Sequence, residues 1–208
     1  GVSVLGEHDD PLIGPPALGG TAHLRQPGEQ RLGTGIGPGL ARAIGGSASW
    51  ANIRGVLKDN IRGLHLYEEP DYSSPKIDVW GISDKDLFME AHAVLKKQST
   101  PFFAVIQTAD NHRPYTIPEE DRPYVKMRSF PKDSLEKYGF WSNEEMNAYA
   151  YMDYTYRVFM EAAAKEKYFA NTLFVFVGDH GIRGNAGTMM PKVWTEQSLT
   201  LQHVPLLF

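Results

Sequence analysis

The chain has 208 residues, a formal net charge of −4 at pH 7 and no cysteine. Its length is sufficient for one sizeable hydrophobic core, and the lack of cysteine excludes disulfides, thiol catalysis and thiolate metal sites. The acidic balance, without any cluster of basic residues, gives no electrostatic reason to expect nucleic-acid binding. No apolar run approaches the roughly 20 residues that a membrane span requires.

Composition changes sharply at Trp50. The preceding 49 residues contain no Phe, Tyr or Trp, yet they hold 12 of the 20 glycines. They show no helical or strand period, and such a stretch buries too little apolar surface to offset its ordering entropy. Residues 1–45 are therefore predicted to be irregular, disordered or not native to the fold, and residues 46–208 to form a partial catalytic domain.

Two segments beyond Trp50 have the apolar spacing of helices. The first runs from Asp84 to Gln98 with Ser83 as its N-cap, and the second runs from Met146 to Lys167. The apolar face of the first helix is predicted to comprise Leu87, Phe88, Ala91, Val94 and Leu95. That of the second is predicted to comprise Tyr149, Met152, Tyr156, Phe159 and Ala163.

Short apolar runs predict three strands at residues 102–107, 173–177 and 204–208. The run Leu173–Val177 is continuous and rich in β-branched and aromatic residues, which is typical of a fully buried strand in a parallel sheet. Residues 110–143, rich in Pro, charge and aromatics, are predicted to be a long surface excursion. The alternation of strands and helices predicts an α/β fold with a parallel sheet.

The tetrapeptide Gly178-Asp179-His180-Gly181 directly follows the 173–177 strand. In open α/β sheets, sites are built at the carboxyl ends of strands. Asp179 and His180 offer one hard oxygen and one nitrogen to a divalent cation, and the flanking glycines allow a sharp backbone turn. An Asp after a strand can also simply cap a turn, and the four residues alone leave both interpretations open.

A second polar cluster follows the strand at residues 102–107. His112 and Arg113 both carry groups that donate hydrogen bonds to phosphoryl oxygens. The alternative is a turn in which Asp110 and Asn111 bond to their own backbone. Because this loop leaves the same end of the predicted sheet as Asp179, we favour the binding interpretation.

Two further clusters are less specific. In the Gly-rich segment at residues 45–55, Trp50 is a candidate apolar wall and Arg54 a candidate phosphate contact, although a surface loop with a packed Trp explains the pattern equally well. His203 precedes the last apolar run, where a lone His is more often structural than a ligand.

Together, these segments resemble lipoteichoic-acid-synthase-like phosphoglycerol transferases, which belong to the sulfatase branch of the alkaline phosphatase superfamily. The resemblance covers residues 45–208. It lies in "TLFVFVGDHG", "FFAVIQTADNHRPY", the helix "YAYMDYTYRVFMEAAAKEKYFANT", "GGSASWANIRG" and "GLHLYEE". It implies an α/β fold with a mostly parallel sheet flanked by helices, incomplete at both ends.

The resemblance also implies a chemistry. Such enzymes are membrane-tethered at the bacterial inner membrane, with an extracytoplasmic (periplasmic) domain that holds a divalent cation, typically Mn²⁺, at a Glu, a Thr nucleophile and an Asp-His pair. Asp179 and His180 match that pair. The Thr attacks a phosphodiester such as the head group of phosphatidylglycerol, and phosphoglycerol passes to a glycan or glycolipid acceptor.

Substrate-binding positions follow from the same resemblance. His112 matches the family's substrate-binding His, with Arg113 beside it. Trp50 and Arg54 lie where the family uses Trp and Arg around glycerol phosphate. Their spacing of four residues departs from the tighter Trp-x-Arg pattern of the family.

The nucleophile is not recognisable in this chain. Thr21 and Thr34 lack a strand-turn-helix context, Glu7 and Glu29 lack a preceding apolar strand, and none of the four is nominated. The family's membrane helices and the C-terminal part of its domain are also absent, so the chain is expected to be an incomplete product.

Three functional hypotheses remain. The parent protein is expected to be a phosphoglycerol transferase, and the chain by itself a catalytically inactive fragment of it. The alternative is a sulfatase or phosphodiesterase that passes the group to water. A sulfatase needs a Cys/Ser-x-Pro/Ala-x-Arg motif, which is not visible here.

Overall fold

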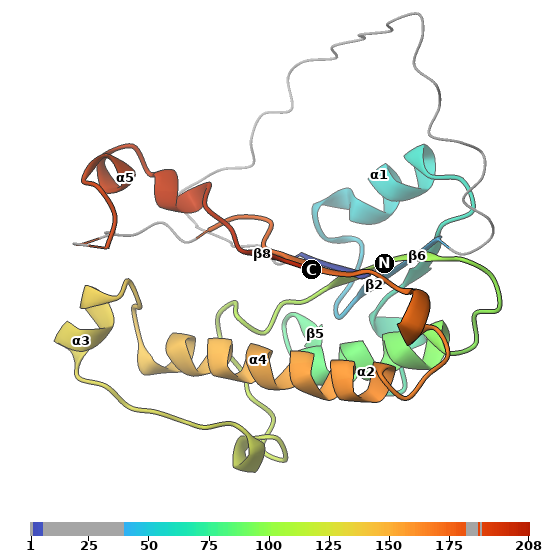
Figure 1. The fold of residues 1–208 in the computed structure, drawn as a ribbon, viewed down its shortest axis with the longest axis horizontal. Helices are drawn as coiled ribbons and strands as arrows, with labels where there is room; N and C mark the ends of the chain where they lie inside the picture. Colours follow the sequence, from blue (N-terminus) through green and yellow to red (C-terminus); the bar gives the residue numbers. More distant parts are fainter. Residues whose placement is uncertain (1, 6–39, 182–186, 188) are drawn as a thin grey trace, which may run out of the picture.

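A six-stranded sheet organises the structure, a computed structural model that describes residues 2–5, 40–181, 187 and 189–208 (Figure 1). Its strand order is β3-β2-β6-β1-β7-β8. The strands are β1 (Val2–Leu5), β2 (Leu40–Ile44), β3 (His65–Tyr67), β6 (Phe103–Gln107), β7 (Phe174–Val177) and β8 (Leu206–Leu207). All pairings are parallel except that of β7 with β8. A separate antiparallel pair consists of β4 (Lys76–Asp78) and β5 (Gly81–Ile82).

The prediction of irregular structure for residues 1–45 is wrong at both ends of that stretch. Strand β1 pairs with β6 on one side and β7 on the other, so it occupies the middle of the sheet. Strand β2 pairs with β3 and β6. Both strands are four or five residues long, and their order comes from backbone pairing with neighbours remote in sequence, which local composition does not report. Residues 6–39 lie outside the described residues.

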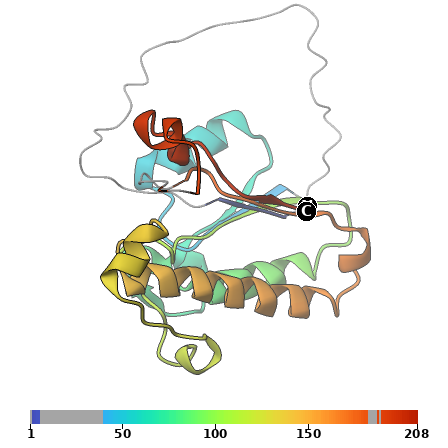
Figure 2. The ribbon, with the colours of Figure 1, turned by 60° about the vertical axis from the view of Figure 1, so that its left-hand side comes forward.

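Helices cover the sheet on both faces. Figures 1 and 2 show α2 and α4 side by side under one face and α1 over the other. The α-helices are α1 (Ile53–Asn60), α2 (Asp84–Leu95), α3 (Lys132–Lys137), α4 (Asn143–Ala163) and α5 (Val193–Glu196). Short 3-10 helices are η1 (Trp50–Asn52), η2 (Glu69–Asp71), η3 (Arg122–Tyr124), η4 (Phe169–Asn171) and η5 (Leu199–Leu201). The predicted α/β fold, a mostly parallel sheet flanked by helices, is therefore confirmed.

Capping residues explain where the two long helices begin. The Ser83 hydroxyl accepts a hydrogen bond from the Asp86 backbone N–H at 3.1 Å, as predicted. Ser142 caps α4 in the same way through the Glu145 N–H at 3.2 Å, which starts that helix three residues earlier than the apolar pattern indicated. Each hydroxyl satisfies one of the free N–H groups of a first helical turn.

The buried face of α4 differs from the predicted one. Tyr149, Met152 and Tyr156 are only half-buried. The buried line of the helix comprises Glu145, Asn147, Ala148, Tyr151, Thr155, Phe159 and Ala163. It is rotated because the first half of α4 packs against the excursion rather than the sheet, where Tyr151 joins Ile117 and Val125. The second half packs on the main core, with Phe159 stacked on Phe88 at a centroid distance of 4.9 Å.

The two last strands are less buried than predicted. Phe174 is buried, but the rest of β7 is half-buried, and Leu173 is exposed. Strand β8 is antiparallel, lies at the sheet edge and is exposed. The reason is that α4 covers only one face here, while α1 covers the other face nearer β2 and β3 (Figure 1). Within the described residues, no helix combines the length and apolarity needed to cross a bilayer.

Candidate metal and phosphate site

The two loops that carry the candidate site follow two strands of the sheet at their carboxyl ends. The loop at residues 108–115 follows β6, and the loop at residues 178–181 follows β7. Both strands flank β1 in parallel register. Since adjacent strands lie about 4.8 Å apart, the two strand ends are separated by about 10 Å. The loops of His112 and Asp179 therefore lie at the same end of the parallel strands, as the sequence predicts.

Asp179 and His180, the candidate metal ligands, lie side by side. The Nε2 atom of His180 lies 3.9 Å from the Oδ1 atom of Asp179, and the two side chains are 31% and 19% exposed. The His180 Nδ1 atom lies 2.7 Å from the carbonyl oxygen of Gly181. Because a carbonyl only accepts, Nδ1 carries the hydrogen, so Nε2 is the ring nitrogen that could coordinate a metal. One carboxylate and one oriented imidazole fit a divalent cation as two of its ligands.

The two glycines around this pair are required by close packing rather than by a special turn. Neither has a positive φ. A Cβ atom on Gly181 would lie only 1.9 Å from the carbonyl oxygen of Thr200, and the Gly181 N–H donates to the Leu201 carbonyl at 2.8 Å. The Gly178 N–H donates to the Pro205 carbonyl at 3.3 Å. Residues 200–205 therefore support the loop from behind.

The remaining ligands of a metal site are not found in the described part of the chain. There, no third His, Cys, Asp or Glu joins Asp179 and His180 in a group that could hold an ion. The statement that Glu7 lacks a preceding apolar strand is wrong, because β1 ends at Leu5, two positions before it. Glu7 itself lies outside the described residues.

The other residues that were not nominated as nucleophile or metal-binding Glu are Thr21, Glu29 and Thr34. They also lie outside the described residues. His203, whose role the sequence left open, is exposed and packs edge-on against the Trp194 ring at 5.1 Å.

The loop of His112 is fixed by a reciprocal pair of buried carboxylates. Asp84, at the start of α2, accepts hydrogen bonds from the backbone N–H groups of Ala109 at 2.8 Å and Asp110 at 3.1 Å. Asp110 in turn accepts from the Asp84 N–H at 2.6 Å. The predicted alternative, in which Asp110 bonds to its own turn, is replaced by this clamp to a helix N-terminus.

Burial has an electrostatic consequence for this clamp. Removal from water raises the pKa of Asp84 to about 6. Burial, reinforced by the nearby Asp84 carboxylate, also raises the pKa of Asp110 well above its usual value. A carboxyl group that loses water favours its neutral form, so the clamp titrates in weakly acidic solution.

Trp80 is a candidate site residue that the sequence did not indicate. Its ring lies 4.6 Å from the His112 ring at an interplanar angle of 34°, and its Nε1–H donates to the Arg113 carbonyl at 2.7 Å. It also contacts Trp50 edge-on at 6.3 Å. Trp80 thus joins the Trp50 segment to the His112 loop, which are 62 residues apart in sequence.

The glycine that follows Trp80 is a local sequence feature that could have drawn attention to this residue. Gly81 has a φ of +110°, and a Cβ atom on it would lie 2.0 Å from the Gly45 carbonyl oxygen. A Cβ atom on Gly46 would lie 2.5 Å from the Trp80 carbonyl oxygen. The Trp-Gly dipeptide before the helix cap therefore marks a close backbone approach.

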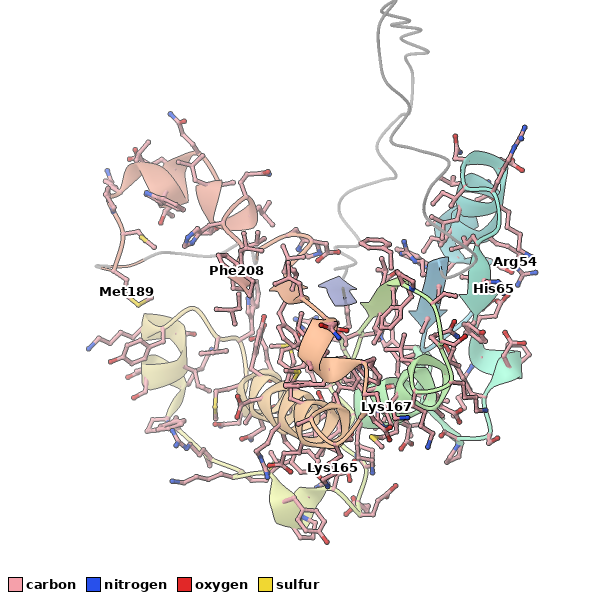
Figure 3. The ribbon with its side chains drawn as sticks, turned by 45° about the vertical axis from the view of Figure 1, so that its right-hand side comes forward. Arg54, His65, Lys165, Lys167, Met189 and Phe208 are labelled. Atoms are coloured by element: carbon pink, nitrogen blue, oxygen red, sulfur yellow. The ribbon has the colours of Figure 1, made fainter. Side chains whose placement is uncertain are left out.

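Arg54 is engaged away from the Asp179 pair. Its Nη2 atom lies 2.6 Å from the Oε2 atom of Glu68, an oxygen that also accepts from the Ala48 N–H at 3.0 Å. In Figure 3, Arg54 is labelled at the right-hand end of the molecule and Phe208 near its middle. Arg54 as a phosphate contact therefore stays a prediction, and so does Arg113, whose side chain is hydrogen-bonded to Tyr115.

Comparison with known proteins assigns the family. The sulfatase family profile matches residues 43–208. The chain is 27% identical over 135 residues to "Lipoteichoic acid synthase-like YvgJ" of Bacillus subtilis, covering 62% of this chain and 21% of that protein. It is 27% identical over 127 residues to a lipoteichoic acid synthase of Staphylococcus saprophyticus, covering 61% and 18%. The chain thus spans about a fifth of the length of these relatives.

Solved structures agree on the fold. A protein of the alkaline phosphatase superfamily from Vibrio parahaemolyticus superimposes with a TM-score of 0.56 at 26% identity, over 81% of this chain and 37% of that one. The lipoteichoic acid synthase LtaP of Listeria monocytogenes gives a TM-score of 0.62 at 17% identity, over 80% and 42%. The chain belongs to the sulfatase family, and its predicted likeness to lipoteichoic acid synthases within the alkaline phosphatase superfamily is confirmed.

Proposed function

We propose that this chain is part of a metal-dependent phosphoglycerol transferase, which moves phosphoglycerol from a phosphatidylglycerol-type lipid to a glycan or glycolipid acceptor. The observation that supports the proposal is the placement of the 108–115 and 178–181 loops at the ends of the two strands that flank β1. One loop offers metal ligands and the other offers donors to a phosphoryl group. The relatives named as lipoteichoic acid synthases support the same reaction class.

Each side chain receives a role in this proposal. Asp179 and His180 would hold the cation, for which Mn²⁺ is our choice, and the cation would offset phosphoryl charge and activate the nucleophile. The His112 imidazole would donate to a non-bridging phosphoryl oxygen. Trp80 and Trp50 would wall the glycerol side of the site and hold the His112 ring in place.

The transfer itself is proposed for the whole protein. We assign no nucleophile among the described residues, and we propose that residues 1–208 alone bind the group without transferring it. We place the whole protein at the outer face of a bacterial membrane, where its lipid donor would be found. Turnover of a phosphatidylglycerol analogue by residues 1–208, lost in Asp179→Ala, would contradict the inactivity of the chain.

Binding can be tested without turnover. Mn²⁺ is paramagnetic, so it broadens the ³¹P resonance of glycerophosphoglycerol, a soluble phosphodiester, when both occupy one site. We expect the chain to bind Mn²⁺ by calorimetry and to broaden this resonance beyond the effect of free Mn²⁺.

Two variants separate the roles. In His112→Ala, we expect Mn²⁺ affinity to stay within about threefold while the protein-dependent broadening falls, because only the phosphoryl donor is lost. In Asp179→Ala, both signals should disappear, because a ligand is lost. Collapse of Mn²⁺ affinity in the His112 variant, or unchanged broadening, would show that this division of roles is wrong.

A further inference from the structure

A large hollow lies between the excursion and α4, outside the site described above. Its volume is about 730 Å³, within the roughly 300–1,000 Å³ typical of ligand sites. Aromatic rings dominate its lining, and basic side chains stand among them. The residues that matter here are Tyr124, Lys126, Arg128, Phe130, Tyr138 and Tyr149.

The wall of this hollow is fixed by paired hydrogen bonds. The side chain of Asn147 accepts from the Arg128 N–H at 2.9 Å and donates to the Arg128 carbonyl at 2.9 Å. Asn143 does the same for Phe130, at 2.8 and 3.1 Å. These two amides tie the backbone of residues 128–130 to α4, so the side chains of that segment project from a fixed frame.

Large apolar side chains are exposed in the segment that borders the hollow, and three of them, Tyr124, Phe130 and Tyr138, line it. Tyr124 is 66% exposed, Tyr138 56% and Trp141 65%, and Met127 and Phe130 are also exposed. All five fall within residues 124–141. Clusters of exposed apolar residues mark interaction sites in soluble domains, whereas isolated ones need no explanation.

Positive charge is concentrated in the same segment. The chain as a whole carries −4, but residues 124–141 hold four basic residues against two acidic ones, which gives +2. The basic residues are Lys126, Arg128, Lys132 and Lys137. Three of them lie within residues 126–132, and Asp133 and Glu136 separate Lys132 from Lys137.

We propose that the aromatic-basic surface, defined as Tyr124, Lys126, Arg128, Phe130, Tyr138 and Trp141, docks on the headgroup region of an anionic phospholipid bilayer. Tyr and Trp rings with an apolar body and a polar tip favour this region, and each nearby Lys or Arg is attracted to anionic lipid. The partner is identified by both features together, because a purely electrostatic partner would not require exposed rings.

The position of the surface relates it to the candidate site. In Figures 1 and 2, α3 and the start of α4 lie at the end of the molecule toward which the parallel strands run. Tyr149, which lines the hollow, is hydrogen-bonded to the side chain of Asn111, the neighbour of His112. Docking by this surface would therefore hold the candidate site close to lipid headgroups.

Vesicle sedimentation without metal tests this proposal. We expect the chain to bind vesicles of 70% phosphatidylcholine and 30% phosphatidylglycerol, and to bind pure phosphatidylcholine vesicles at least tenfold more weakly (vesicle compositions chosen for charge contrast, at roughly physiological salt). The double variant Lys126→Glu/Arg128→Glu should lower binding to the anionic vesicles at least tenfold.

A matched pair of lysines provides the control. Lys165 and Lys167 are exposed just beyond the other end of α4 (Figure 3), so Lys165→Glu/Lys167→Glu makes the same change of charge elsewhere. We expect it to change binding by less than about threefold. Trp141→Phe should remove most of the blue shift in tryptophan emission that vesicles cause, since Trp141 is the exposed Trp of the surface.

Three results would overturn the proposal. They are no preference for anionic vesicles, equal losses in the two charge-reversal pairs, and binding to soluble polyphosphate but not to vesicles. Asp179→Ala should bind vesicles as the unaltered chain does. The vesicle and Mn²⁺ experiments can therefore fail independently of each other.

Discussion

The loops after β6 and β7 carry the two halves of the candidate site, but they are held in opposite ways. The His112 loop is buried and fixed by side chains, through the Asp84–Asp110 clamp and the Trp80 ring. The Asp179 loop is more open and is fixed by backbone packing against residues 200–205. The difference indicates that the ligand pair tolerates side-chain changes structurally, whereas the His112 loop does not.

The largest expected effect is on metal affinity. Asp179→Ala should weaken Mn²⁺ binding by more than about 100-fold, because even outer-shell partners of metal ligands contribute 10- to 100-fold. Since the side chain is partly exposed, the free energy of unfolding should change by less than about 1 kcal/mol. Calorimetry and urea unfolding measure the two quantities, with the exposed Asp59→Ala as control. Equal Mn²⁺ affinity in the two variants would rule out Asp179 as a ligand.

Backbone packing behind the ligand pair is tested at the glycines. Gly181→Ala places a methyl group 1.9 Å from the Thr200 carbonyl oxygen, and such overpacking typically costs about 1–3 kcal/mol. Gly178→Ala is the matched control, since its Cβ atom would meet Val204 at 3.3 Å and should cost less. Urea unfolding of both variants gives the comparison. If Gly178→Ala were the more damaging change, the support from residues 200–205 would be misassigned.

The clamp on the other loop predicts a pH dependence. A carboxyl whose pKa is raised on folding binds its proton more tightly in the folded state, so its stabilising contribution is lost as pH rises through the folded pKa. For Asp84 this loss lies between the ordinary aspartate pKa of 3.8 and the raised pKa of about 6. In Asp84→Asn, we expect the free energy of unfolding to fall less steeply as pH rises through this range.

Urea titrations at pH 4, 5, 6 and 7 measure this slope. The exposed Asp59→Asn serves as control and should leave the slope unchanged. A steeper slope in Asp84→Asn than in the unaltered chain would mean that burial does not set the titration of the clamp.

The smallest expected effect is at Trp80. Loss of the ring in Trp80→Leu should weaken the phosphodiester-dependent ³¹P broadening by about 2- to 10-fold, as aromatic pairs contribute about 0.5–1.5 kcal/mol. Trp80→Phe should retain most of it. The readout specific to positioning is the His112 ring-proton NMR shift, which moves toward its free value in the Leu variant and less in the Phe variant. An unchanged chemical shift would show that the Trp80 and His112 rings do not contact each other in solution.

Several elements of this protein follow from short-range patterns. The Ser83 cap, the start of α2 and the apolar strand before Asp179 were all predictable, because a cap, a helical face and a buried strand leave their mark within a few residues. The burial of α4 was predicted correctly at Phe159 and Ala163 but one position off before them. Its first half packs against Ile117 and Val125, and no local period reports that partner.

The residues of the candidate site also differ in whether a local pattern indicates them. Asp179 and His180 were proposed as metal ligands because they follow their strand directly. Trp80 was missed because its stacking partner, His112, lies 32 residues away and follows a different strand.

By itself, the sequence determined the α/β class and the family, since these rest on motifs and periods within single segments, and it proposed Asp179 and His180 as metal ligands. Tertiary structure alone decided that Val2–Leu5 lies between β6 and β7, that Gly181 must lack a side chain, and that two buried carboxyls hold the His112 loop. In each case the cause is contact between segments far apart in the chain, whose pairing, close approach or loss of water is a property of the assembled fold.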